Sequence, residues 1–367
     1  MRRPIRNTAV FGCLATIAAL TVTPAIRSQE VPVSSFKITA PADSNTYTGV
    51  LVGGNPFSKT PAATTIDAVL VPLIVEVVQG SDVLMFDPTS PNYCGPNAGV
   101  SPVDRFRKSP LVVARNLSFN GVNVGKWQYV PAEKRAEFWH MPGGQLLADT
   151  IHWTFAAPMT LPSAKSKGAT VKVDASTGCE YAELVNGAIS KTITNSLIPQ
   201  LQKSGTISTS TFVLFMTVDV VQLKSDGTCC NNGDHGAILS SPPQTFGWAQ
   251  YDSHGGTDIK GLTHEIAEWM NNPFYSNLTP AWGFIGEAAT DCVDHLEVGD
   301  PMNTDVVPYT SPDGFVYHPQ ELAFFGWFFD QPGGGKLYGT GGKYSSNGTF
   351  IGAHNTCPPG GSFPPTL

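Results

Sequence analysis

The longest apolar runs of the chain predict the strands of a buried sheet. Residues 68–78 (AVLVPLIVEVV) and 211–223 (TFVLFMTVDVVQL) are nearly continuous in apolar side chains, many of them β-branched or aromatic, which is typical of central strands. Residues 244–252 (QTFGWAQYD) predict another strand. Proline, glycine and asparagine punctuate residues 30–130, so we expect this region to consist of strands and turns.

Helical spacing of apolar residues marks three other stretches. Residues 131–141 (PAEKRAEFWHM) predict a short helix with Pro131 in its first turn, where a missing N–H is tolerated. Residues 184–205 predict a longer helix that stops at a glycine, and residues 258–270 predict a third. This order of helix, strand, strand and helix predicts a sheet packed against a helix, in an α+β fold.

The predicted helix 258–270 has one apolar face. At 100° per residue, five side chains fall within an arc of about 100° and are expected to face the core. They are Ile259, Leu262, Ile266, Trp269 and Met270. Thr257 or Asp258 is expected to cap the N-terminus, and residues 271–273 (NNP) are expected to end the helix.

By composition the chain divides into four regions. Residues 1–28 resemble a targeting segment, residues 29–180 are rich in predicted strands, and residues 181–330 contain the helix just described. Residues 331–367 form a tail rich in glycine and proline. Such a composition buries little apolar surface, so we expect the tail to lie on the surface or to be disordered.

The first 28 residues have the pattern of a signal peptide. Three arginines precede an apolar stretch at 9–22, which at 14 residues is short for a membrane span. Cleavage is expected after Ala25 or Ser28, with an uncleaved membrane anchor as the alternative. No other stretch is long and apolar enough to cross a bilayer, so the sequence predicts a secreted or periplasmic protein without stable membrane insertion.

Charge excludes one class of partner. The full chain has a net charge of −7, and without the four arginines of the targeting segment it has 18 basic and 29 acidic residues, a net charge of −11. An acidic protein is a poor partner for nucleic acid or for an anionic membrane surface. Charged residues make up only 14% of the chain, against about 25% in typical globular domains, which suits a loop-rich extracellular protein.

Six cysteines follow the targeting segment, and an even number in an exported chain predicts up to three disulfides. They are Cys94, Cys179, Cys229, Cys230, Cys292 and Cys357. The adjacent pair lacks the C-x-x-C spacing of a metal site. We therefore expect Cys229 and Cys230 to bond to two different partners.

The segment 261–273 (GLTHEIAEWMNNP) begins like the zinc-protease signature H-E-x-x-H, but Glu268 replaces the second histidine. His264 and Glu268 are four residues apart, so on a helix they stack on one face and can reach one ion. Carboxylate is an accepted ligand for zinc and also for manganese, iron or calcium. Glu265 lies about 100° further round, where it is placed to act as a catalytic general base. Alternatively, these side chains are only polar residues on a solvent-exposed face of the helix and bind no metal.

A third ligand is expected further along the chain. Glu297 stands 29 residues beyond Glu268, and Asp300 stands in a turn between glycine and proline. Either carboxylate can complete a site for one divalent metal ion, with zinc as the first choice. His318 and His235 are weaker alternatives for the same role.

Several segments carry a resemblance to a family of exported bacterial proteins of undetermined function. They are HEIAEWMNNP (264–273), TPAWGFIGEAATDC (279–292), LEVGDP (296–301), YHPQELAFFGWFF (317–329) and GKWQYVPAEKRAEFW (125–139). The likeness spans most of the chain after the targeting segment. Where that family usually has Asp-Asp-Pro after the helix, this chain has Asn271-Asn272-Pro273, so these asparagines are expected to do no more than cap the helix.

A more distant resemblance is to plant exordium-like, phosphate-induced cell-wall proteins. The shared elements are a Cys-rich loop ending in His-Gly (229–236), an H-E-x-x-E-x-x-x-N-P helix (264–273) and an E-x-G-D element (297–300). This resemblance implies a zincin-like fold, in which a mixed sheet packs on an active-site helix. No reaction is established for either family.

Two hypotheses of function follow. The first is a secreted metallohydrolase, possibly a peptidase, with His264, Glu268 and either Glu297 or Asp300 as ligands and Glu265 as base. The second is a non-catalytic cell-envelope protein on a zincin-like scaffold, with a structural ion or none. A peptide or a cell-wall polymer is the expected partner. The presence of Glu265 favours the first hypothesis, whereas the missing second histidine favours the second.

Overall fold

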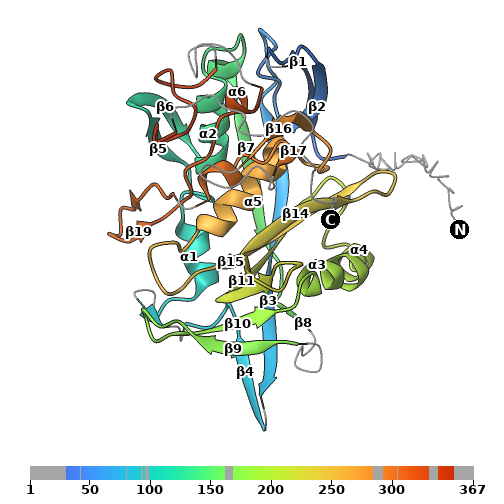
Figure 1. Ribbon diagram of the computed structural model, residues 1–367, viewed down its shortest axis with the longest axis vertical. Helices are drawn as coiled ribbons and strands as arrows, with labels where there is room; N and C mark the ends of the chain where they lie inside the picture. Colours follow the sequence, from blue (N-terminus) through green and yellow to red (C-terminus); the bar gives the residue numbers. More distant parts are fainter. Residues whose placement is uncertain are drawn as a thin grey trace, which may run out of the picture.

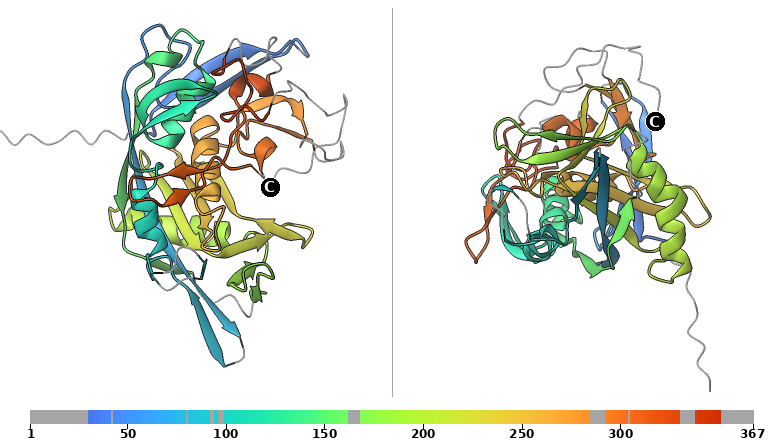
Figure 2. Two further views of the ribbon diagram at one scale, coloured as in Figure 1. Left: turned by 90° about the vertical axis from the view of Figure 1, so that its left-hand side faces the viewer. Right: turned by 90° about the horizontal axis from the view of Figure 1, so that it is seen from below.

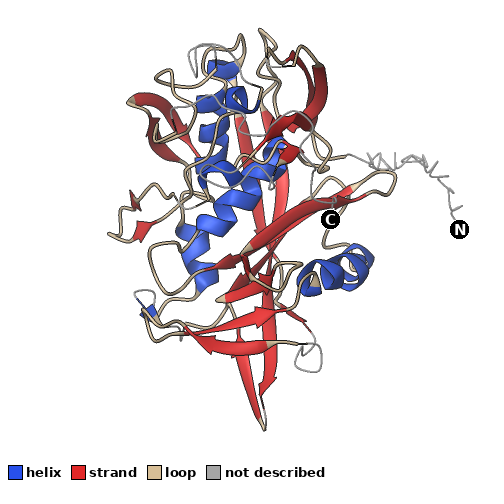
Figure 3. Ribbon diagram, in the orientation of Figure 1, coloured by secondary structure: helices blue, strands red, loops and turns tan. Residues whose placement is uncertain are grey.

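The computed structural model describes residues 30–350 apart from residues 42, 80, 92–93, 96–98, 162–167, 284–291, 304 and 330–337. The predicted signal peptide at 1–28 lies outside the described residues. Within them, several sheets combine with short and medium-length helices, so the fold is α+β as predicted (Figures 1 and 3). No helix in this part of the chain is long and apolar enough to span a membrane.

A seven-stranded mixed sheet runs through the centre of the molecule (Figure 3). Its strands are β3 (Thr64–Gln79), β4 (Asp82–Phe86), β7 (Asp149–Phe155), β8 (Met159–Leu161), β11 (Phe212–Val218), β14 (Gly233–Ile238) and β15 (Gln244–Tyr251). β11 lies parallel to both β3 and β15, and β7 and β8 are also parallel to β3. β14 pairs antiparallel with β15 and forms the end of the strand order.

β3 organises this sheet because it changes partner along its length. Its first half pairs with β7 as far as Leu70, and its second half pairs with β8 from Leu73 onwards. Pro72, which has no N–H to donate, stands where the partner changes. Residues 68–73 are all buried, as expected for a strand covered on both faces, and the prediction of a strand at 68–78 is confirmed.

The remaining sheets are smaller. They are β1 (Val33–Thr39) with β2 (Thr46–Val52), β5 (Arg115–Phe119) with β6 (Val122–Trp127), β16 (Leu278–Trp282) with β17 (Val293–His295), β18 (Tyr309–Thr310) with β19 (Val316–Tyr317), and a four-stranded sheet in the order β13 (Cys229–Asn231), β12 (Val220–Leu223), β10 (Glu180–Leu184), β9 (Thr170–Val173).

The predicted single strand at 211–223 is divided into β11 and β12, so that expectation was wrong in part. Asp219 separates them with a backbone φ of 51°, a conformation that aspartate tolerates better than most residues. The turn passes the chain from the seven-stranded sheet to the four-stranded sheet. An apolar run alone carries no sign of such a division.

Helix α5 (Lys260–Asn271) corresponds to the helix predicted at 258–270 and packs against β14 and β15 (Figures 1 and 2). All five side chains of the predicted apolar face are buried, and the Trp269 ring stacks on Phe212 of β11 at 3.8 Å. The predicted cap was wrong, because neither Thr257 nor Asp258 caps α5. Asp258 instead accepts hydrogen bonds from the backbone and ring of His318.

The other helices are shorter. They are α1 (Pro102–Lys108), α2 (Tyr129–Glu137), α3 (Ala188–Thr192), α4 (Ile198–Lys203) and α6 (Phe325–Phe328), with a π-helical turn at Ile193–Leu197 and 3-10 turns at Gly144–Leu146 and Asp300–Met302. α2 overlaps the helix predicted at 131–141 but begins two residues earlier and ends four residues earlier. α2 also contacts α5, which matters for the buried acids between them.

The tail buries more than its composition predicted. Residues 351–367 lie outside the described residues, but Tyr338, Tyr344 and Phe350 are each less than 10% exposed. Tyr338 contacts the rings of Phe138 and Phe325, so the tail contributes to an aromatic cluster. The expectation that this region buries little was therefore wrong for residues 338–350. Its three aromatic rings are buried although the segment is rich in glycine.

Two disulfides lie within the described residues. Cys94 joins Cys179 across 85 residues of sequence, and Cys229 joins its neighbour Cys230. Cys292 is buried and is also disulfide-bonded. The prediction that the adjacent cysteines bond to different partners was wrong: Cys179 is already paired with Cys94, and Cys229 and Cys230 lie together on the short strand β13.

Candidate metal centre

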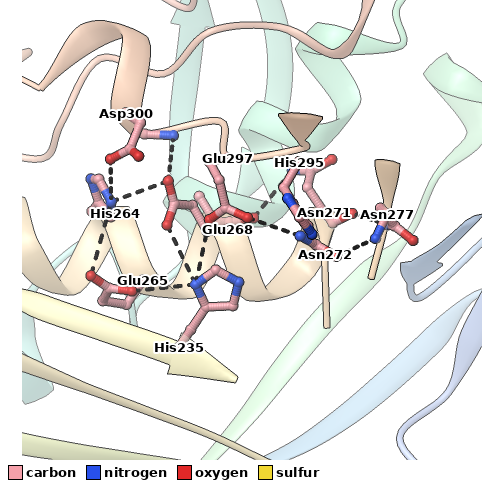
Figure 4. A network of polar contacts seen from close by, with 12 residues as sticks. His235, His264, Glu265, Glu268, Asn271, Asn272, Asn277, His295, Glu297 and Asp300 are labelled. Carbon is pink, nitrogen blue, oxygen red and sulfur yellow. Dashed lines mark hydrogen bonds and ion pairs between the residues drawn. The ribbon is translucent and has the colours of Figure 1, made fainter. Parts of the chain in front are cut away.

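The polar face of α5 meets a turn that follows β17. His264 and Glu268 stack as predicted, with 3.1 Å between His264 Nε2 and Glu268 Oε1 (Figure 4). Asp300 comes from the 3-10 turn at Asp300–Met302, and its Oδ1 lies 3.4 Å from the same histidine nitrogen. Three potential ligand atoms from two segments therefore converge on one point.

The orientation of His264 is set from behind the ring by Gln320. The amide nitrogen of Gln320 donates to the carbonyl oxygens of Gly299 and Met302, so its oxygen is the atom that faces His264 Nδ1, at 2.9 Å. Nδ1 must then carry the proton and donate it to Gln320. Nε2 is then the nitrogen directed at Glu268 and Asp300, and in the neutral ring it is the atom that can bind a metal.

His235 enters the cluster from the edge strand β14. Its Nδ1 lies 3.4 Å from Glu268 Oε2, 3.5 Å from Glu265 Oε2 and 3.8 Å from Glu297 Oε2 (Figure 4). The sequence favoured His235 only weakly, because it lies 29 residues before His264 in a glycine-rich loop sequence. The signal that pointed to it was the Cys-rich loop ending in His-Gly.

Glu297 is held by the asparagine that follows α5. Asn272 Nδ2 donates to Glu297 Oε1 at 2.9 Å, and Asn272 Oδ1 accepts from the backbone N–H groups of Ser276 and Asn277, both at 2.8 Å. The expectation that Asn272 only caps the helix was therefore wrong. With one oxygen fixed by Asn272, the other oxygen of Glu297 is directed at His235.

Two glycines make room for these side chains. A Cβ atom at Gly299 would overlap the His264 ring, and a Cβ at Gly233 would overlap the Glu265 carboxylate. The Gly299 N–H also donates to Glu268 Oε1 at 3.1 Å. Both positions therefore need a residue without a side chain, because backbone approaches the cluster closely there.

Burial and mutual repulsion set the protonation of the cluster. Burial raises the pKa of Glu265 to about 7 and that of Asp300 to about 7. Burial and the charge of Glu268 raise the pKa of Glu297 well above its usual range. Burial lowers the pKa of His264, but the carboxylates of Glu268 and Glu265 outweigh this effect and raise it to about 10. Without a bound cation, the centre therefore holds protons instead.

The centre opens onto a cleft of about 220 Å³. His264, Glu265 and Asp300 line this cleft together with two lysines, Lys224 and Lys260. A neighbouring cleft of about 540 Å³ shares Cys230 and Asn232 with it and continues towards Tyr181 and His254. The side chains of Glu268, His235 and Glu297 lie deeper, each no more than 5% exposed.

Two further histidines of the described chain do not belong to either group of converging ligand atoms. His318, a weaker alternative as ligand, is bonded to Asp258 before α5. His295 pairs with Asp294 at 2.7 Å and stacks on the Tyr275 ring at 4.8 Å.

Comparison of the chain with family models, with curated proteins and with solved structures found no match.

Proposed function

We propose that this protein is an exported metallohydrolase whose divalent ion, zinc as the first choice, is held by His264, Glu268 and Asp300. The observation that carries the proposal is the convergence of these three side chains with the His264 Nε2 lone pair directed inwards by Gln320. The signal-peptide pattern of residues 1–28 and the predicted disulfide bonding support export.

The spacing of the donor atoms supports an ion rather than simple salt bridges. Four-coordinate zinc has bonds of about 2.0–2.1 Å to nitrogen and oxygen, so its tetrahedral ligand atoms lie roughly 3.3 Å apart. The 3.1 Å and 3.4 Å distances around His264 Nε2 fit that value. Charge-assisted hydrogen bonds between such groups are typically shorter, about 2.7–2.9 Å.

Glu265 is placed to move a proton beside this site. Its Oε1 lies 3.9 Å from His264 Nε2, it lines the same cleft, and burial raises its pKa to about 7. A carboxyl group with a pKa near the working pH is suited to accept and return a proton. A bound divalent ion supplies Lewis-acid chemistry, polarising a carbonyl group or activating water.

The shape of the surface supports an extended substrate. The two adjoining clefts meet at Cys230 and Asn232, so a chain lying across the site can occupy both. Peptide is the substrate class we favour, with cell-wall polymer as the alternative. A mixed sheet whose antiparallel edge strand β14 lies beside the site helix also supports a zincin-like scaffold.

Metal content and hydrolysis in three proteins test this proposal. The wild type, purified without chelator, is expected to contain a divalent ion by elemental analysis and to cleave members of a peptide panel. E268A should lose most of the ion and the activity, whereas E265Q should keep the ion held by His264, Glu268 and Asp300 and lose the activity. A wild type without metal, or equal metal in E268A, would contradict the proposal.

The second candidate is a non-catalytic envelope protein with a structural ion. The observation that favours it is the replacement of the second signature histidine by Glu268, since an anionic ligand weakens the Lewis acidity of the ion. In that case the wild type binds metal but cleaves nothing on the panel, and E265Q is indistinguishable from it.

A further inference from the structure

The polar cluster separates into two groups that share one residue. The outer group is His264, Glu268 and Asp300, and it borders the cleft. The inner group is His235, Glu268, Glu265 and Glu297, and apart from Glu265, which also reaches the cleft, it lies beneath the first. We propose that the centre holds two divalent ions, one in each group, with the Glu268 carboxylate bridging them. This inference rests on the proposed function, because it concerns the same site.

The two oxygens of Glu268 serve different histidines. Oε1 faces His264 Nε2 at 3.1 Å, and Oε2 faces His235 Nδ1 at 3.4 Å (Figure 4). A carboxylate used in this way presents one oxygen to each of two ions, as is usual in sites where two metals lie about 3.5–4 Å apart. A single ion on one oxygen leaves the other histidine without a metal.

The inner group has donor spacing similar to that of the outer group. His235 Nδ1 lies 3.4, 3.5 and 3.8 Å from oxygens of Glu268, Glu265 and Glu297. These distances are close to the roughly 3.3 Å expected between ligands of a tetrahedral ion and longer than a charge-assisted hydrogen bond. Imidazole and carboxylate are also ligands that zinc and manganese accept.

Charge balance favours two ions over one. The cluster contains four carboxylates, from Glu265, Glu268, Glu297 and Asp300, and two imidazoles. With all four carboxylates ionised and both histidines neutral, one divalent ion leaves a charge of −2 and two leave none. Uncompensated charge is costly in a buried site, and three of the four carboxylates are no more than 5% exposed.

The two ions are expected to bind with unequal strength. The outer histidine is oriented by Gln320, whereas the buried Nε2 of His235 has no hydrogen-bond partner among the described residues. Ligands that are oriented by a neighbour bind metal more tightly. The outer ion should therefore bind first, and the inner ion should bind more weakly beneath it.

Titration of the metal-free protein with Zn²⁺, read by native mass spectrometry, tests the count. The wild type should take up two ions in two steps of different affinity. H235Q and E297Q should each take up one ion, because both remove an inner ligand and spare the outer group. D300N should also take up one ion, because it removes an outer ligand. E268A should take up none, because it removes the residue shared by both groups. H318A, a histidine outside the cluster, should keep two.

Loading with Mn²⁺ gives an independent readout. Two manganese ions bridged by one carboxylate are magnetically coupled, so the electron paramagnetic resonance spectrum of the wild type should differ from that of single-ion H235Q. E297Q provides the same test if H235Q does not fold, because Glu297 lies on a different segment.

Each other result counts against the inference. One ion in the wild type that persists unchanged in H235Q and E297Q would show a mononuclear outer site, leaving the proposed function intact. One ion that disappears in H235Q would show that only the inner group binds. No ion in the wild type would overturn both the inference and the proposed function.

Discussion

Buried acidic side chains lie on two sides of helix α5, and the two sides differ in whether histidines lie beside the acids. On one side Glu265 and Glu268 meet His235 and His264. On the other side Asn271 and two glutamates of α2, Glu133 and Glu137, line a cavity of about 10 Å³, room for about one water molecule. Within the described residues, no histidine lines that cavity.

Burial raises carboxyl pKa values on both sides, and on the α2 side no described histidine lies beside them. Burial raises the pKa of Glu137 to about 8 and that of Glu133 well above its usual range. Lys134, the nearby cation, is engaged by Asp149 at 2.8 Å and by backbone carbonyls. Within the described residues, neither carboxylate oxygen of Glu133 has a hydrogen-bond partner.

Under the proposed function, the comparison teaches that burial alone does not make a carboxylate a metal ligand, because both sides are buried and only one has histidines. On the α2 side, the low-dielectric surroundings favour protonated glutamates. On the histidine side, neutral imidazole nitrogens add ligands that carry no charge, so a cation can replace the protons. Four predictions test this distinction, in order of decreasing effect.

Removal of metal should have the largest effect, and only through the histidine side. A chelator should lower the melting temperature of the wild type, because an ion present at 1,000 times its Kd stabilises the fold by about 4 kcal/mol. Adding Zn²⁺ should restore it. E137Q should show the same chelator-induced shift, measured by differential scanning calorimetry. If the shift is absent in E137Q, the metal depends on the α2 side, and the proposed difference between the two sides is wrong.

Glu137 should make the protein less stable as pH rises. Between its ordinary pKa of 4.5 and its folded value of about 8, the folded protein keeps a proton that the unfolded chain has released. The free energy of unfolding therefore falls across this window and levels off above it. E137Q cannot ionise, so relative to the wild type it should gain roughly 3 kcal/mol or less between pH 5 and pH 8.5.

Urea unfolding at these two pH values measures the effect. E180Q, at an exposed glutamate of β10, is the matched control and should follow the wild type. An E137Q variant whose stability relative to the wild type is the same at both pH values would mean that Glu137 is ionised when buried.

The adjacent asparagines at the end of α5 should behave differently. N272A removes the hydrogen bond that orients Glu297, so we expect Zn²⁺ affinity of the inner group to fall roughly tenfold or more. N271A removes a side chain on the α2 side and should leave Zn²⁺ affinity unchanged. Isothermal titration calorimetry of both variants measures this, and equal losses would remove the distinction between the two sides.

The smallest effect is expected before the start of α5. H318A removes the ring hydrogen bond to Asp258 but keeps the backbone one, so it should cost about 1 kcal/mol or less. Its metal content should equal that of the wild type. A loss of metal in H318A would show that the site depends on how α5 begins.

Elements with a local signal could be predicted from the amino-acid sequence. The apolar run at 68–78 and the stripe of α5 were predicted because burial on one or both faces leaves a periodic trace in the chain. The stacking of His264 and Glu268 follows from helix geometry alone, since residues four apart are neighbours on any α-helix.

The rest of the site is assembled by contacts between segments that the sequence does not relate to one another. The sequence left Glu297 and Asp300 as equal alternatives, and the structure brings Asp300 to His264 and Glu297 to His235. The bonding of Cys229 to Cys230 and the role of Asn272 also escaped prediction. The contacts of Asp300, Glu297 and Asn272 depend on how β14, α5 and the turn after β17 pack together. Segments that are far apart in the sequence leave no periodic pattern that shows how close they come in space.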